Sequence, residues 1–148
     1  MKKILPPILF LVCVVLMVSL CWSLKIEHNL SYPITLIGIP FIISGLLLCV
    51  ISKSVFKREN TNIMTFGMPN KLVTSGPFQY SRNPMYLGFS IALFGFVLAI
   101  GASFLAFVFL LIFVAVSHAW YIRFEEQKMK QAFGKDYLFY CNKVRRWF

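Results

Sequence analysis

Two polar tracts stand out in an otherwise apolar sequence because their residues could bind a charged molecule. The first, residues 72–88, contains Arg82, Asn83 and Tyr86, and the second, residues 123–137, begins with the adjacent Glu125 and Glu126. An arginine beside a helix N-terminus is a favourable site for a carboxylate or a phosphate. If the apolar sequence between the tracts forms a helical hairpin, both tracts reach one surface and the arginine faces the two carboxylates.

Each tract also has a purely structural interpretation. Asn83 followed by Pro84 predicts a helix start, with the asparagine side chain as the N-cap and the proline at the first helical position. That interpretation leaves Arg82 and Tyr86 unexplained. The two glutamates fit an exposed helix start balanced by nearby lysines. His118 lies on the same helical stripe as Glu125, as either a hydrogen-bonded interface residue or a base.

The composition predicts one all-α integral membrane domain covering residues 1–148. Apolar residues make up 59% of the chain and charged residues only 14%. Because a bilayer core needs about 20 apolar residues, four stretches are candidate spans: residues 4–24, 32–51, 85–100 and 102–122.

The segments between and after the spans also carry predictions. The connection from 52 to 82 is expected to fold over the membrane surface. The small residues around Gly45 are expected to form a helix contact. Gln127 to Phe133 predicts a short amphipathic helix that Gly134 ends, followed by an aromatic and basic interfacial tail.

The charge pattern predicts the orientation. The net charge is +10, and every lysine and arginine except Lys25 lies at the N-terminal tip, in residues 52–84, or after residue 122. Positively charged segments remain in the cytoplasm. Both termini, the long loop and the C-terminal segment are therefore expected on the cytoplasmic side of a bacterial-type inner (plasma) membrane. Flanking charge explains the basicity without nucleic acid.

Other functional classes fit less well. The four cysteines show no paired spacing and the two histidines are isolated, so neither a disulfide framework nor a metal site is predicted. A small four-helix exporter driven by protons needs an ionisable residue inside a span, and the four stretches have no Asp, Glu, Lys or Arg. A non-enzymatic module that binds anionic lipid or a partner subunit stays open as an alternative, and nothing in the sequence gives the oligomeric state.

The two tracts together resemble a group of membrane-embedded methyltransferases. The resemblance, from residue 72 to 147, rests on Gly76-Pro-Phe-x-Tyr80, Arg82-x-Pro-x-Tyr86, Glu125-Glu126, and Phe133-Gly-x-x-Tyr137-x-x-Tyr140 before Val144-x-Arg146. The group includes the isoprenylcysteine carboxyl methyltransferases and the phospholipid N-methyltransferases. Many of its members have histidine where this chain has Asn83, which puts a role for this position as a base in doubt.

The resemblance implies S-adenosylmethionine as methyl donor, held by the C-terminal hairpin and tail, and a lipophilic acceptor at the cytoplasmic membrane surface. The sequence agrees in having no glycine-rich phosphate loop of a soluble nucleotide domain. The acceptor atom, oxygen, nitrogen or sulfur, is left open. The implied catalytic residues are Arg82, Asn83, Tyr86 and Glu125. The implied donor-binding residues are Arg82, Tyr86, His118, Glu125, Glu126, Tyr137 and Tyr140.

Overall fold

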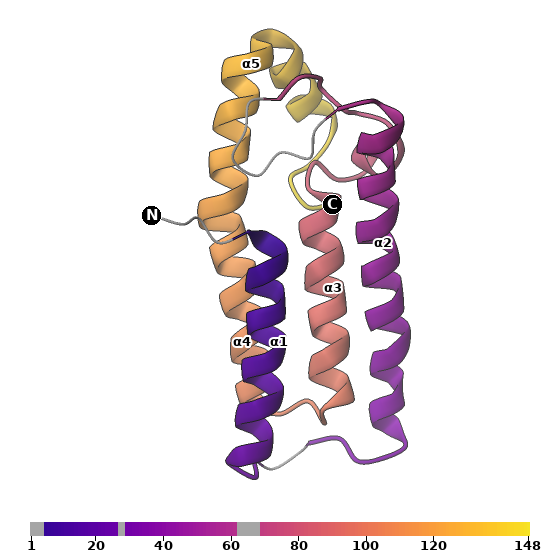
Figure 1. Cartoon of the computed structure of the whole chain (residues 1–148), viewed down its shortest axis with the longest axis vertical. Helices are drawn as coiled ribbons and strands as arrows, with labels where there is room; N and C mark the ends of the chain where they lie inside the picture. Colours follow the sequence, from indigo (N-terminus) through magenta and orange to yellow (C-terminus); the bar gives the residue numbers. More distant parts are fainter. Residues whose placement is uncertain (1–4, 27–28, 62–68) are drawn as a thin grey trace.

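The protein is a bundle of long helices whose polar segments gather at one end (Figure 1). The computed structural model describes residues 5–26, 29–61 and 69–148, and these contain no strand. The helices are α1 (Pro6–Ser23), α2 (Gly38–Arg58), α3 (Pro84–Ala99), α4 (Phe104–Val116) and α5 (Ile122–Lys143). Short turns of helix precede α2 (η1, Ile34–Ile37) and α3 (η2, Gly76–Gln79), and a π-helical turn joins α4 to α5 (η3, Ser117–Tyr121).

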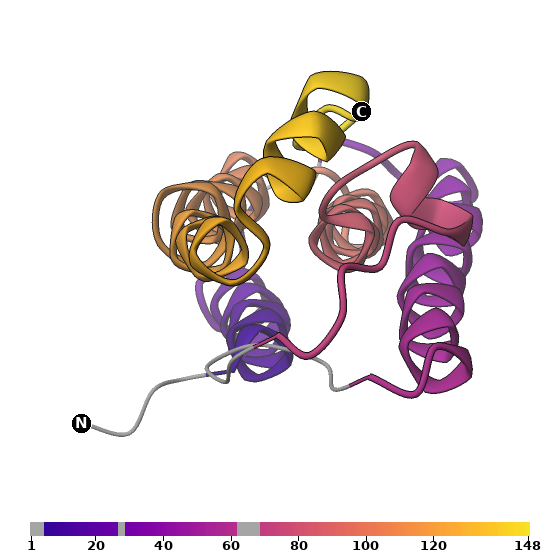
Figure 2. The ribbon, with the colours of Figure 1, turned by 90° about the horizontal axis from the view of Figure 1, so that it is seen from above.

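Helix α3 lies between α2 on one side and the pair α1 and α4 on the other (Figure 2). The core between α1, α3 and α4 is apolar and aromatic, with Phe10, Phe89 and Phe113 in mutual ring contact. Within the described residues, three helical segments are long and apolar enough to cross a membrane: Pro6–Ser23, Ile34–Arg58 and the first part of Phe104–Lys143. The 16-residue α3 is shorter, as its 16-residue apolar stretch predicted. The regular structure of the described residues is thus all helical, and the apolar helices are those of an integral membrane protein.

Glycines bring the backbones of α2 and α3 into direct contact. A Cβ atom added to Gly45 would lie 2.4 Å from the backbone nitrogen of Ala92 and 2.5 Å from the carbonyl oxygen of Gly88. One added to Gly95 would lie 2.6 Å from the nitrogen of Ile42. Small residues allow such close approach between membrane helices. This confirms the helix contact predicted around Gly45.

Two helix boundaries differ from the prediction. Helix α2 continues to Arg58, beyond the expected end at residue 51, because its last turns carry charged residues that are exposed without interrupting the helix. The predicted short helix Gln127–Phe133 is not separate, because the chain is helical without a break from Phe104 through η3 into α5.

Gly134 reverses the direction of the chain within α5. Its φ of 48° and ψ of −115° are non-helical, and helical residues follow it up to Lys143 (Figure 1). Glycine adopts a positive φ without a steric penalty. The stop predicted at Gly134 is confirmed, but the second half of α5 then returns towards the N-terminal end of α3. There the backbone N–H of Arg82 donates to the carbonyl of Arg145 at 3.0 Å.

Candidate functional site

A cavity lies at the end of the bundle where α1 and α3 begin and α2 ends. The cavity has a volume of about 140 Å³ and opens to solvent at its mouth. Both polar tracts line it. From the first come Arg82, Asn83 and Tyr86, and from the second Glu125, Glu126, Met129 and Tyr137. Tyr140 follows the second tract, and the apolar lining includes Pro6, Pro7, Phe56 and Phe89.

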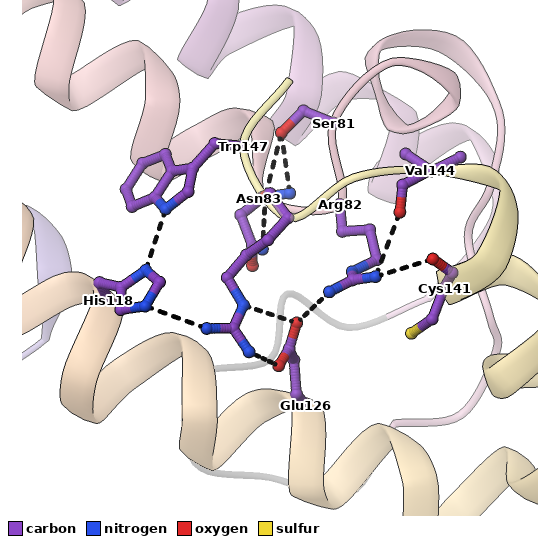
Figure 3. Close-up of polar contacts among 9 residues, drawn as sticks. Ser81, Arg82, Asn83, His118, Glu126, Cys141, Val144 and Trp147 are labelled. Carbon is purple, nitrogen blue, oxygen red and sulfur yellow. Dashed lines mark hydrogen bonds and ion pairs between the residues drawn. The ribbon is translucent and has the colours of Figure 1, made fainter.

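Glu126 is the centre of a buried ionic network (Figure 3). Arg82 donates from Nη2 to Oε1 at 2.7 Å, and Arg146 donates from Nε to Oε1 at 3.1 Å and from Nη2 to Oε2. Burial alone would raise the pKa of Glu126, but the hydrogen bonds from Arg146 and Arg82 outweigh it and hold the pKa below its ordinary value. This carboxylate therefore stays ionised and cross-links α5, the start of α3 and the C-terminal segment.

Most of the Arg82 guanidinium is used within the protein. Besides Glu126, its Nη1 donates to the carbonyl oxygens of Cys141 and Val144, each at 3.1 Å (Figure 3). Its Nε–H is buried and has no partner among the residues that the structure describes. Both terminal nitrogens of Arg82, which the sequence offered to a bound anion, are thus occupied within the protein, and one donor is left on a residue that lines the cavity.

Asn83 occupies the N-cap position of α3, but its side chain does not cap the helix. Instead, Nδ2 donates to the carbonyl of Arg146 at 2.9 Å, while the backbone N–H of Asn83 donates to Ser81 Oγ at 3.1 Å. The prediction that the Asn83 side chain caps α3 is therefore wrong, although Pro84 does start the helix. The asparagine binds the C-terminal segment, which the sequence places 63 residues away.

Glu125 has a different environment from its neighbour. It is half-buried, lines the cavity, and accepts a hydrogen bond from the Tyr86 hydroxyl at 2.8 Å. It lies beyond the end of the predicted fourth span. Burial raises the pKa of Glu125 to about 8, against the lowering effect of the tyrosine hydrogen bond. In the described part of the chain no cation pairs with this carboxylate, so it has unused acceptor capacity.

His118 lies outside the lining of the cavity, in the π-helical turn. A π turn holds one more residue than an α turn, which shifts the helical stripe. The predicted alignment of His118 with Glu125 is therefore wrong: the histidine contacts Arg146, the partner of Glu126, with 3.2 Å between Nε2 and Nη1. The indole N–H of Trp147 donates to His118 Nδ1 at 3.1 Å (Figure 3).

Two tyrosines from the second half of α5 complete the lining. Tyr137 and Tyr140 are buried, with ring centres 6.2 Å apart, and the Tyr140 hydroxyl donates to the carbonyl of Phe78 at 2.6 Å. Burial raises the pKa of both phenols, so they remain neutral donors at physiological pH. Their aromatic faces and hydroxyls offer contacts to a bound cation or hydroxyl group.

Several residues of the site were not among the candidates. Arg146 binds Glu126 and Trp147 binds His118, although the tail was interpreted as an interfacial anchor. Phe148, by contrast, is 80% exposed. The only signal for Arg146 was its place in the Val144-x-Arg146 element of the resemblance, because no periodic pattern links the tail to α3.

A comparison with known families matches residues 33–136 to the family described as phospholipid methyltransferase. No curated protein matches the chain significantly, and no solved structure does. The match spans most of the chain, from the residue before η1 to just past Gly134, and includes both glutamates and the start of α3. It confirms the resemblance drawn from the two polar tracts. The chain belongs to the phospholipid methyltransferase family, a family of methyltransferases that act on lipid-type substrates.

Proposed function

We propose that the protein transfers a methyl group from S-adenosylmethionine to a lipophilic acceptor at the cytoplasmic face of a bacterial-type inner membrane. The observation that carries the proposal is the composition of the cavity. One part of its lining is polar and comes from the two motif tracts, and the other is apolar and comes from the ends of the membrane helices α1 and α2. Such a lining suits a polar methyl donor and an acceptor that enters from the bilayer.

The residues present fit the groups of the donor. S-adenosylmethionine has an ammonium, a carboxylate, a ribose diol and a sulfonium. Glu125 has acceptor capacity for the ammonium or the ribose hydroxyls, and the unpartnered Nε–H of Arg82 is a donor for the carboxylate. Tyr86, Tyr137 and Tyr140 supply aromatic faces for a cation.

When bound, this donor would supply an electrophilic methyl group on a sulfonium whose charge is lost as the methyl leaves. Displacement of this kind depends mainly on in-line positioning and exclusion of water. The protein contributes a buried, cross-linked wall for that purpose. Asn83, Glu126 and His118 act as positioning residues, because each binds Arg146 in the C-terminal segment. Glu125, the three tyrosines and the Nε–H of Arg82 remain as the groups that contact the donor.

The proposal is tested with purified protein, labelled S-adenosylmethionine and lipid extracts. Wild type is expected to move label into the lipid phase. At about pH 8.5, where Glu125 is mostly ionised, Glu125→Gln is expected to reduce the rate about tenfold or more, through loss of a charge-assisted hydrogen bond. Asp136→Asn is the matched control, because Asp136 is an exposed carboxylate on the same helix. If no extract accepts label from wild type, the proposed function is wrong.

A further inference from the structure

Four charged residues line the cavity, and only one ion pair forms among them, between Arg82 and Glu126. Arg82 and Glu126 belong to the buried network with Arg146. The other two are Glu125, discussed above, and Lys71, which has no part in that network. Lys71 lies between α2 and α3 in the chain, 13 residues before the start of α3.

The partner of Lys71 is an acid outside the cavity. Lys71 Nζ pairs with Glu59 at the C-terminal end of α2, and Ser75 Oγ donates to the same carboxylate at 3.1 Å. The side chain of Lys71 is 54% exposed and that of Glu59 is 30% exposed. An exposed ion pair contributes little free energy. Exchange of the Glu59 carboxylate for an anion of a ligand would therefore cost little.

Apolar residues line the cavity together with Lys71. They are Pro69 and Val73 from its own segment, Phe56 from the last turns of α2, and Pro6 and Pro7 at the start of α1. Both α1 and α2 are long and apolar enough to span a membrane, and the lining includes the first residues of α1 and the last turns of α2. A cation in a cavity with such an apolar lining suits an amphiphile, with its chain on the apolar residues and its anionic group on the lysine.

We propose that Lys71 is a specificity-determining residue that binds an anionic group, a phosphate or a carboxylate, of the lipophilic acceptor. The inference rests on the proposed function, since it assigns one residue to the acceptor rather than to the methyl donor. In the occupied cavity, the lysine exchanges Glu59 for the anion of the acceptor. Glu59 holds the lysine in place when no acceptor is bound.

The test measures binding without turnover. Dodecyl phosphate, dodecanoate and dodecanol are titrated into protein in dodecyl maltoside, and the thermal unfolding midpoint reports binding. Lys71→Gln is expected to lower the affinity for dodecyl phosphate about three- to tenfold. The affinity for the singly charged dodecanoate should fall less, and the affinity for dodecanol should not change. Lys71→Arg is expected to keep the affinity. Lys57→Gln is the matched control, because Lys57 is exposed on α2 outside the cavity.

Glu59→Gln separates recognition from a purely structural role. If Lys71 binds the anion, Glu59→Gln frees it, and affinity for dodecyl phosphate rises or stays the same. Equal weakening by Glu59→Gln and Lys71→Gln would instead mean that the pair only holds the segment in place. The inference is also overturned if wild type does not bind dodecyl phosphate, or if Lys71→Gln binds it as tightly as wild type does. It is overturned likewise if Lys71→Gln weakens the binding of S-adenosylmethionine instead of the binding of dodecyl phosphate. Absence of methyl transfer by wild type would count against the proposed function alone.

Discussion

At the scale of single residues, the two adjacent glutamates have different roles. Glu126 is ionised between two arginines, whereas Glu125 pairs only with a tyrosine hydroxyl in the described part of the chain. The sequence identified the pair of glutamates but not the difference between their environments. Neighbouring side chains on a helix point about 100° apart, and the partners of these two come from distant segments of the chain. Arg146, the second partner of Glu126, lies 20 residues further along the chain.

The raised pKa of Glu125 makes stability depend on pH. Between the ordinary pKa of 4.5 and the folded value of about 8, the folded state retains a proton that the unfolded chain has released. This contribution is fully present below pH 4.5 and is lost as the pH rises through about 8. We expect the melting temperature of wild type to fall more between these limits than that of Glu125→Gln. Parallel melting curves for the two proteins would contradict the assignment. Glu126, whose pKa is lowered, loses stabilisation only at lower pH.

Asn83 is expected to stabilise the C-terminal segment rather than cap α3. Asn83→Ser keeps a capping side chain but cannot reach the carbonyl of Arg146, so one hydrogen bond worth about 0.5–1.5 kcal/mol is lost. Amide hydrogen exchange in residues 144–147 should accelerate about 2- to 10-fold. Asn142→Ser, at an exposed position, is the control. Unchanged exchange in Asn83→Ser would show that the amide bond to the tail is not significant.

At the scale of helices, local sequence predicted most of the fold. Long apolar runs give the spans, Pro84 starts α3 and Gly134 reverses α5, because these signals act within a few residues. The π turn at Ser117–Tyr121 was not predictable in this way. Its residues are compatible with an α-helix, and the side chain that the turn presents to the tail, His118, contacts Arg146, which lies 28 residues further along the chain.

The contact between α2 and α3 should tolerate no side chain at Gly45. Gly45→Ala places a Cβ against the backbone of Ala92 and Gly88, which cannot move as a side chain can. Overpacking of this kind costs about 1–3 kcal/mol. Unfolding of Gly45→Ala by denaturing detergent should therefore occur at a lower concentration than for wild type. Ser44→Ala, one residue away on the exposed face, is the control. Equal unfolding of both variants would mean that the helices do not pack in this way.

At the scale of the whole molecule, the site is assembled by topology. Helices α1 and α3 begin, and α2 ends, at the end of the bundle that holds the cavity, while the turn between α3 and α4 lies at the other end (Figure 1). The apolar hairpin between the two polar tracts predicted that they meet. Nothing in the sequence indicated that the tail folds back onto α3, because the hydrogen bonds to the carbonyls of the tail depend on distant side chains.

The same topology predicts the orientation in the membrane. A reporter fused after Phe148 should register in the cytoplasm, and one inserted between residues 100 and 103 should register outside it, because positive charge gathers at the cavity end. Fusions are compared in intact cells with reporters active on one side only. A C-terminal reporter outside the cytoplasm would exclude a cytoplasmic site.

The most direct test of the account is the affinity for S-adenosylmethionine of wild type, Glu125→Gln and Asp136→Asn. Purified proteins are compared in one detergent at about pH 8.5, where Glu125 is mostly ionised. Loss of a charge-assisted hydrogen bond of roughly 1.5–3 kcal/mol predicts binding about 10- to 150-fold weaker in Glu125→Gln. Asp136→Asn should bind like wild type, and all three should unfold cooperatively. If Glu125→Gln is folded and binds the donor as tightly as wild type, Glu125 does not hold the donor and the proposed site is wrong.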